Sequence, residues 1–316
     1  MKIELKSTVA TREAYGKALA AYGQEHAEIV VMDADLSKST KTADFAAVCP
    51  ERFFNAGIAE QNMMGVAAGL AASGKTPFVS TFAVFATGRA FEQIRNSIAY
   101  PRLNVKIAAT HAGITVGEDG GSHQSVADIA LMRAMPNMTV VVPADGIETA
   151  QAVEALAQSK GPAYLRLGRL ATPQVNGEDY RFELGKGVLL RRGSDVAIFA
   201  CGMMVAPALA AADLLAQESI QAAVANIHTL KPLDESFIAE LAAECGCAVT
   251  AEEHSIIGGL GSAVAEVVAQ NRPVPVLRVG INDSFGQSGS PAVLLEKYGL
   301  TAIHIASRAK AAIARK

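Results

Sequence analysis

The chain has 316 residues, of which 50% are hydrophobic and 19% are charged, and its formal net charge at pH 7 is -3. This composition excludes a disordered protein and is typical of about two domains. It offers no Lys/Arg cluster for nucleic acid and no uncharged run of about 18 apolar residues for a membrane span. Met1–Lys6 lacks the apolar core of a signal peptide and the four cysteines form no recognisable pattern, so we expect a cytoplasmic protein with reduced thiols.

The first half of the chain alternates short β-rich runs with alanine-rich segments of helical period. The predicted strands are Ile29–Met32, Phe78–Thr81, Val105–Ala108 and Thr139–Val142, and the predicted helices cover 12–22, 60–72, 88–98 and 146–158. Continuous apolar strands separated by helices predict a mostly parallel sheet with helices on both faces.

Residues 171–186 interrupt this alternation with a polar stretch that contains Pro173 and Gly177, which predicts an inter-domain linker. The alternation then resumes, with strands predicted at 196–200, 222–226, 248–251 and 274–279 and helices at 203–217, 234–244 and 260–270. The predicted fold class is α/β, with two doubly wound domains that cover residues 1–175 and 186–316.

Polar loops follow the predicted strands of the first half, at the sheet edge where α/β proteins bind ligands. Glu60 begins a nearly uncharged helix, so it is either a helix-capping glutamate or, in such apolar surroundings, a group suited to proton transfer. Phe82 and Phe85 stand at the end of a strand, where they are either core aromatics or a stacking surface for a flat heterocycle.

The loop 111–124 is the most polar feature of the chain and carries His111, Asp119, His123 and four glycines. Three interpretations are open: a metal site, a surface loop with incidental histidines, or a recognition site for a hydroxylated or anionic substrate. The residues lack the fixed spacing of a zinc motif, so no metal ligands are assigned and the recognition site fits better. The glycines indicate backbone bends or the close approach of a ligand.

Several stretches, in order and at matching spacing, resemble the C-terminal portion of transketolase. They are Asp33–Ser37, Gly57–Gln61, Ser80–Phe85, Gly117–Gln124, Pro136–Met138, His228–Leu233, Glu252–Ser255 and Gly258–Gly261. The resemblance covers nearly all of the pyrimidine-binding and C-terminal domains of that family. It implies thiamine diphosphate as the cofactor and the transfer of a two-carbon ketol unit from a ketose phosphate to an aldose phosphate.

The resemblance also implies roles at the cofactor. Glu60 matches the glutamate that hydrogen-bonds a ring nitrogen of the aminopyrimidine and so activates the cofactor. Phe82 and Phe85 match aromatic residues that pack on the pyrimidine, and Asp35 matches an aspartate that lines the cofactor site. Ala86–Gly88 departs from the family pattern, which has a tyrosine after the second phenylalanine, and this puts a third aromatic contact in doubt.

At the substrate, the resemblance assigns His123 to catalysis and, with Asp119, to the sugar hydroxyl groups. His111 matches a residue at the acceptor-phosphate end. Either Arg166 or Arg169 matches the phosphate-binding arginine, because the local match requires a gap, and a guanidinium fork suits phosphate.

The family holds Mg²⁺ and the cofactor diphosphate through a Gly-Asp-Gly motif that this sequence does not contain. Its Asp-Gly pairs, Asp119-Gly120 and Asp145-Gly146, are preceded by Glu118 and Ala144. We therefore expect a partner subunit to supply the diphosphate-binding half and most of the Mg²⁺ site, in an alpha2beta2 assembly as in split transketolases.

Two other functions remain open. The chain also matches the corresponding half of deoxyxylulose-phosphate synthase or the beta subunit of a 2-oxoacid dehydrogenase, although Ser80–Phe82 and Gly117–Gln124 favour transketolase. A non-catalytic assembly subunit is the remaining alternative, and the presence of Glu60 together with Phe82 and His123 argues against it.

Overall fold

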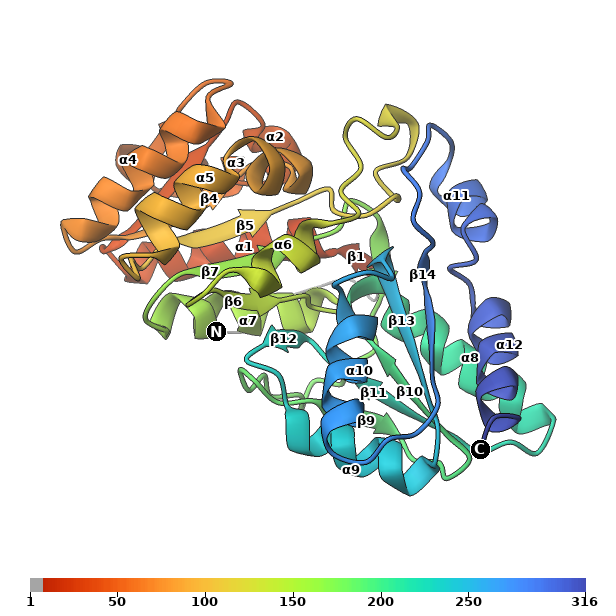
Figure 1. The fold of residues 1–316 in the computed structure, drawn as a ribbon. Coiled ribbons are helices and arrows are strands. Elements are labelled where there is room, and N and C mark those ends of the chain that lie inside the picture. Colours follow the sequence, from red (N-terminus) through yellow and green to blue (C-terminus); the bar gives the residue numbers. More distant parts are fainter. Residues whose placement is uncertain (1–7) are drawn as a thin grey trace.

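Two sheets organise residues 8–316, the part of the chain that this computed structural model describes (Figure 1). A seven-stranded sheet has the order β12-β6-β7-β5-β4-β2-β3, a five-stranded sheet has the order β14-β13-β10-β11-β9, and β1 pairs with β8. The prediction for Met1–Lys6 lies outside the described residues. Within 8–316, none of the helices has the length and apolar character needed to cross a membrane.

The seven-stranded sheet belongs mainly to the first half of the chain. Its strands are β2 (Ile29–Asp33), β3 (Phe53–Asn55), β4 (Thr76–Ser80), β5 (Lys106–Ala109), β6 (Thr139–Val141), β7 (Ala163–Arg166) and β12 (Thr229–Lys231). All neighbouring pairs are parallel except β12 with β6. Most of these strands are buried along their whole length, as expected for a parallel sheet with both faces covered.

Helices cover both faces of this sheet and form two separate apolar clusters. One face carries α1 (Thr11–Glu25), α3 (Ala43–Val48) and α7 (Gly146–Gln158). The other carries α4 (Glu60–Ala72), α5 (Phe91–Gln93), the π-helical turn η3 (Ile94–Ala99) and α6 (Asp128–Ala134). The short elements α2 (Ser37–Thr40), η1 (Pro50–Arg52) and η4 (Gly117–Asp119) lie in the connecting loops.

The predicted helix 60–72 is confirmed, whereas the predicted helix 88–98 is broken. A π-helical turn, η2 (Phe85–Arg89), precedes the short α5, and a second π-helical turn follows it. The Thr87 hydroxyl donates to the carbonyl of Ala83 at 2.8 Å, a back-bond that perturbs regular helix geometry. Such π turns are frequent at functional sites, and η2 lies beside the N-terminus of α4.

The five-stranded sheet belongs to the second half of the chain. Its strands are β9 (Val188–Arg191), β10 (Val196–Ala200), β11 (Ala222–Asn226), β13 (Ala248–Ser255) and β14 (Val276–Ile281). Its helices are η5 (Gly202–Met204), α8 (Val205–Gln217), α9 (Glu235–Cys245), α10 (Leu260–Gln270), α11 (Pro291–Lys297) and α12 (Ala302–Ile313). Helices α8 and α12 pack on one face, and α9 and α10 on the other, so the predicted fold class of two doubly wound α/β units is confirmed.

The two units are joined more closely than a linker alone would require. Strand β8 (Ala171–Pro173) pairs with β1 (Thr8–Ala10), and the Asp145 carboxylate accepts the amides of Val175 and Asn176, so the predicted linker is fixed to the first unit. Strand β12 comes from the second half yet completes the first sheet, and one apolar cluster runs through both units. The boundaries 1–175 and 186–316 remain a prediction.

Candidate active site

The loops predicted to carry chemistry converge on one edge of the seven-stranded sheet. Strands β2, β3, β4, β5 and β7 are mutually parallel neighbours, so their carboxyl ends lie at the same edge. A bridge between Phe82 and Thr110 continues the β4–β5 pairing into the two loops that follow these strands. This edge is the usual ligand-binding position in an open parallel sheet.

Glu60 is the first residue of α4, and only 2% of its surface is exposed. Both carboxylate oxygens accept hydrogen bonds at 2.9 Å from Nη1 of Arg89, the last residue of η2. The Arg89 guanidinium also lies 4.7 Å from the centre of the Phe85 ring, at cation–π distance. Within residues 8–316 the Glu60 carboxylate bonds to Arg89 and not to an amide of its own helix, so Glu60 does not cap α4.

Four rings gather beside Glu60 and Arg89. Phe82 and Phe85 are nearly parallel, with centroids 5.8 Å apart and an interplanar angle of 11°. His111 stacks on Phe82 at 3.8 Å, and His123 meets Phe85 edge-on at 5.5 Å. The two phenylalanines and two histidines singled out in the sequence therefore form one aromatic cluster, although they come from two loops.

His111 is held in an unusual state. Its φ of 56° lies in the left-handed region, which a residue other than glycine rarely adopts, and Nδ1 lies 2.9 Å from the hydroxyl of Thr110. Burial, together with the nearby guanidinium groups of Arg12 and Arg169, lowers the pKa of His111 to about 3. The imidazole is consequently neutral at physiological pH and can donate or accept a hydrogen bond.

Arg12 and Arg169 give this end of the site a positive charge. The Gly168 amide donates to the Thr11 hydroxyl at 2.8 Å, which brings together the backbone segments that carry Arg169 and Arg12. Burial lowers the pKa of Arg12, and repulsion from Arg169 acts in the same direction. Arg12 Nη1 donates to the carbonyl of Ser39 at 2.6 Å, while its buried Nε has no hydrogen-bond partner within residues 8–316. A buried donor without a partner, next to a second cation, fits an anion such as phosphate.

The structure separates the two arginines that the sequence could not distinguish. Arg166 is buried and forms a two-point ion pair with Asp128, at 2.7 Å from Nε and 3.2 Å from Nη2. Arg169 has 39% of its side chain exposed, donates to the carbonyl of Val116 and lies 3.5 Å from Glu118. Arg166 is committed to its partner, so the geometry favours Arg169 as the phosphate ligand.

Asp35 and Asp119 lie at the same sheet edge but outside the aromatic cluster. Asp35 follows β2 with a φ of 63° and exchanges hydrogen bonds with Asn55 at 3.1 and 3.2 Å. Asp119 is exposed in the turn Gly117–Asp119. Both side chains face solvent, where a substrate or a second subunit could reach them.

Sequence reasoning missed Arg12 and Arg89. Arg12 stands at the start of α1, far from the polar loops in sequence, and no motif marks it. Arg89 was assigned to a regular helix 88–98, and only the π-helical turn brings it back to Glu60. A sequence signal for either contact would require knowledge of the fold.

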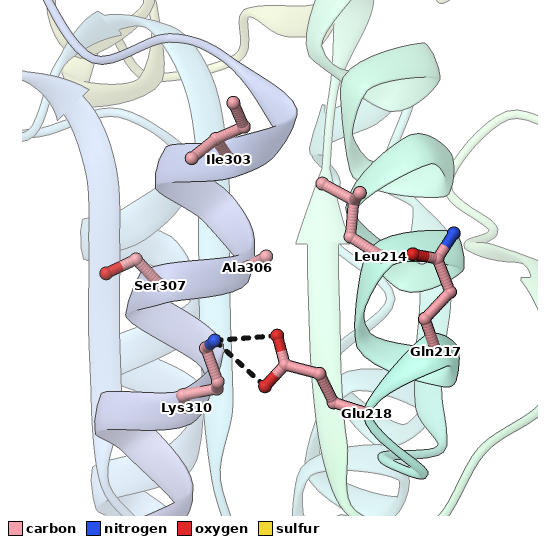
Figure 2. Close-up of a pocket in the computed structure, with 7 residues that line it drawn as sticks. All are labelled: Leu214, Gln217, Glu218, Ile303, Ala306, Ser307 and Lys310. Carbon is pink, nitrogen blue, oxygen red and sulfur yellow. Dashed lines mark hydrogen bonds and ion pairs between the residues drawn. The ribbon is translucent and has the colours of Figure 1, made fainter.

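Within residues 8–316, no group of three or more His, Cys, Asp or Glu side chains could hold a metal ion. A surface pocket in the second unit lies between α8 and α12, as Figure 2 shows, with the Lys310–Glu218 ion pair at one end. The pocket has mixed apolar and polar walls and none of the side chains predicted to act in catalysis.

Two family models match the chain. Residues 7–174 match the model described as the transketolase pyrimidine binding domain, and residues 185–305 match the transketolase C-terminal domain. Together they cover both α/β units.

Individual relatives match over 94% or more of their length. A Methanocaldococcus jannaschii protein described as a transketolase C-terminal section is 52% identical over 300 residues, which cover 94% of each chain. A subunit of 6-deoxy-6-sulfo-D-fructose transketolase from Clostridium sp. (strain MSTE9) is 45% identical, with 96% of this chain and 95% of that protein covered. A solved split-gene transketolase, described as an inactive beta4 tetramer, is 59% identical and has a TM-score of 0.92, covering 98% of this chain and 99% of its own.

Proposed function

This chain belongs to the transketolase family as a split subunit, and on that premise we propose that it is the pyrimidine-binding half of a thiamine diphosphate-dependent transketolase. The proposed reaction moves a two-carbon ketol unit from a ketose phosphate to an aldose phosphate. The observation that carries the proposal is the buried carboxylate of Glu60 beside the parallel rings of Phe82 and Phe85, at the carboxyl edge of the sheet.

The residues around Glu60 fit one end of the cofactor, the aminopyrimidine ring. Phe82 and Phe85 offer flat apolar faces, and Glu60 offers a buried hydrogen-bonding carboxyl group. When bound, the cofactor would supply the carbon nucleophile for ketol transfer. Glu60 would hold a proton at the ring nitrogen of the aminopyrimidine, and the phenylalanines would orient the ring and exclude water.

The same residues do not fit the other end of the cofactor. The sequence lacks the Gly-Asp-Gly motif, and the structure offers no cluster of metal-binding side chains in residues 8–316. We therefore assign the diphosphate and Mg²⁺ to a partner subunit that corresponds to the N-terminal half of transketolase. An alpha2beta2 assembly is the arrangement we propose.

The substrate would lie along the outer part of the site. We assign His123 to the reacting hydroxyl groups and Asp119 to the sugar, because their loop carries His111 and His123 into the aromatic cluster. The substrate phosphate would bind between Arg12 and Arg169, with neutral His111 as a further hydrogen-bonding partner.

The surface around α4 is suited to the partner subunit. Phe54 of β3, Ile58 in the loop before α4 and Val66 of α4 expose 47%, 79% and 43% of their surface, apolar area that a second chain would cover. Gly65 and Gly69 of α4 are exposed, and a methyl group at either position would meet no atom within 4 Å. This face carries no charged residue from Gln61 to Gly69, so a second chain can pack closely beside Glu60.

Reconstitution tests the proposal directly. The purified chain is mixed with a transketolase N-terminal half that carries Gly-Asp-Gly, together with thiamine diphosphate and Mg²⁺, and ketol transfer from a ketose phosphate to an aldose phosphate is measured. Activity that requires both chains is the expected result. Condensation of pyruvate with glyceraldehyde phosphate would favour the synthase function instead, and equal ketol transfer by this chain alone would contradict the half-site assignment.

A further inference from the structure

The loop 111–124, which carries the proposed substrate ligands, is supported by the second α/β unit. Glu253 of β13 accepts the amide of Thr115 at 2.7 Å across the boundary between the two units. Gly113 lies directly against the same carboxylate, with a φ of 81°, and a Cβ atom there would overlap the Glu253 carboxyl group. The inner half of the loop is thus shaped around a side chain from the other unit.

Glu253 is itself held firmly. It is 4% exposed, and Nη2 of Arg166 donates to its backbone carbonyl at 2.9 Å. Arg166 is fixed in turn by the two-point ion pair with Asp128, which also accepts the Tyr164 hydroxyl at 2.8 Å. Every group in this chain of contacts is buried, so the carboxylate that supports the loop has little freedom to move.

The neighbouring carboxylate, Glu252, bonds within its own unit, in contrast to Glu253. Glu252, one residue earlier on β13, accepts the amides of Leu260 and Gly261 at 2.7 Å and so caps α10 inside its own unit. Successive side chains of a strand point to opposite faces, so Glu253 points away from α10 and across the boundary. Both carboxylates are buried, but only Glu253 bonds to the substrate loop.

The supported segment leads directly to the aromatic cluster. Only Ala112 separates Gly113 from His111, which stacks on Phe82 at 3.8 Å. The Gly113 amide donates to the carbonyl of Ser125, two residues beyond His123, at 2.8 Å. A shift of Gly113 would therefore move the backbone that carries both histidines.

We propose that Glu253 is a positioning residue for substrate binding, through which the C-terminal domain sets the place of His111 and His123. This inference rests on the proposed function. Glu253 contacts the loop backbone and not the Glu60 end of the site, so its loss affects sugar-phosphate binding and leaves cofactor binding intact. Small displacements of substrate-positioning groups are enough to change reactivity substantially.

The test compares Glu253→Gln with Glu252→Gln as a matched control. In Glu253→Gln an amide NH₂ replaces one acceptor oxygen opposite backbone N–H groups, so we expect the KM for the sugar phosphate to rise about tenfold in the reconstituted enzyme. The kcat is expected to fall as well, because His123 moves with the loop, whereas the calorimetric affinity for thiamine diphosphate is expected to stay within about threefold of wild type. Glu252→Gln is expected to lower the thermal stability without changing the KM.

A second measurement does not depend on activity. Hydrogen exchange of residues 112–117 in the chain alone is expected to accelerate in Glu253→Gln and to stay at the wild-type rate in Glu252→Gln. Gly113→Ala probes the same contact from the loop side and is the variant to use if Glu253→Gln does not fold. It is expected to raise the KM and to accelerate exchange in the same way.

Two outcomes overturn the inference: unchanged exchange at 112–117 in both loop-contact variants, or a KM that rises equally in Glu252→Gln. If the wild-type pair shows no ketol transfer, the proposed function is refuted but the Glu253 contact is not. The exchange measurement would still test that contact.

Discussion

Glu60 and Arg89 form a buried contact in which one guanidinium nitrogen bonds both carboxylate oxygens. If the carboxylate acts in proton transfer, Glu60→Gln removes the proton-holding group while keeping the size of the side chain. We expect ketol transfer by the reconstituted pair to fall by roughly 10²- to 10⁴-fold, the usual range for the loss of a general acid–base group. Steady-state kinetics at saturating cofactor measure this change.

A matched control separates this effect from a general loss of folding. Glu154 is an exposed glutamate on α7, and Glu154→Gln is expected to leave turnover unchanged. Wild-type turnover in Glu60→Gln would show that this carboxylate has no role in proton transfer.

Replacement by methionine is expected to affect substrate binding at Arg169 and the stability of the fold at Arg166. If Arg169 binds the substrate phosphate as proposed, Arg169→Met is expected to raise the KM for phosphorylated sugars roughly 10- to 100-fold, with little change for unphosphorylated sugars. Arg166→Met leaves Asp128 buried and unpaired, and is expected to lower the free energy of unfolding by about 3–5 kcal/mol.

Kinetics with both substrate types and urea unfolding of each variant check the two outcomes. The assignment of phosphate to Arg169 fails if Arg169→Met weakens the binding of phosphorylated and unphosphorylated sugars equally.

His228 makes the stability of the chain sensitive to acid. Burial lowers its pKa from the ordinary 6.5 to about 4, so between these values the unfolded chain binds a proton that the folded chain does not. The contribution is present above pH 6.5 and is lost as the pH falls towards 4. At pH 4.5 the stability lost relative to neutral pH amounts to roughly 2–3 kcal/mol.

Urea unfolding of His228→Gln at pH 7.5 and 4.5 measures this effect. The variant is expected to lose less stability on acidification than wild type. Part of the acid sensitivity is expected to remain because the pKa of His111 is lowered in the same direction. An identical pH dependence in His228→Gln and wild type would refute the role of His228.

At the scale of elements, α4 carries a prediction that links stability to assembly. Glycine destabilises a helix interior, so Gly65→Ala and Gly69→Ala are each expected to stabilise the chain by about 0.5–1 kcal/mol, because the added methyl groups meet no neighbour. The same methyl groups would project into the proposed interface and weaken binding to the partner. Urea unfolding and sedimentation with the partner measure the two effects.

Gly23→Ala on α1 is the matched control, since a Cβ atom there would overlap the ring of Phe45 and is expected to destabilise the chain by about 1–3 kcal/mol. Unfolding is measured at two protein concentrations, because self-association through α4 would make the result depend on concentration. Unchanged partner affinity in both α4 variants would show that the interface lies elsewhere.

The sequence predicted element bounds best where the hydrophobic period and the length of a segment both indicated the same type of element. The strands at 196–200 and 222–226 and the helices at 60–72 and 260–270 have the predicted bounds. Strands β1, β3, β7, β8, β9 and β12 were missed because each has only three or four residues without a flanking apolar run, and their pairing depends on distant parts of the chain. The π-helical turns were missed because an i→i+5 hydrogen bond has no sequence signal comparable to helical period.

The candidate site was predictable in composition but not in its contacts. The ring distances place Phe82 and Phe85 in one cluster with His111 and His123, although His111 was expected at the acceptor-phosphate end. The roles of Glu60 and these rings remain predictions. Arg12, Arg89 and Glu253 come from segments distant from their partners or from the other unit, so only the folded chain shows what they contact.

At the scale of the whole molecule, the two α/β units are expected to unfold together. One apolar cluster extends through both units, β12 pairs with β6, and Arg166 bonds to both Asp128 and Glu253. We expect a single calorimetric transition in which the van't Hoff and calorimetric enthalpies agree. Two resolved transitions would show that the units are energetically independent.

Strand β12 also bears on where a gene of this family can be divided. The strand leaves the second half of the chain, completes the edge of the first sheet beside β6, and returns. A gene break in the linker at 171–186 would leave β6 in the first product and its partner strand β12 in the second. Each product would then expose an unpaired strand that is open to aggregation. Gene fission between these two domains is thus penalised by the topology, which favours keeping them in one reading frame.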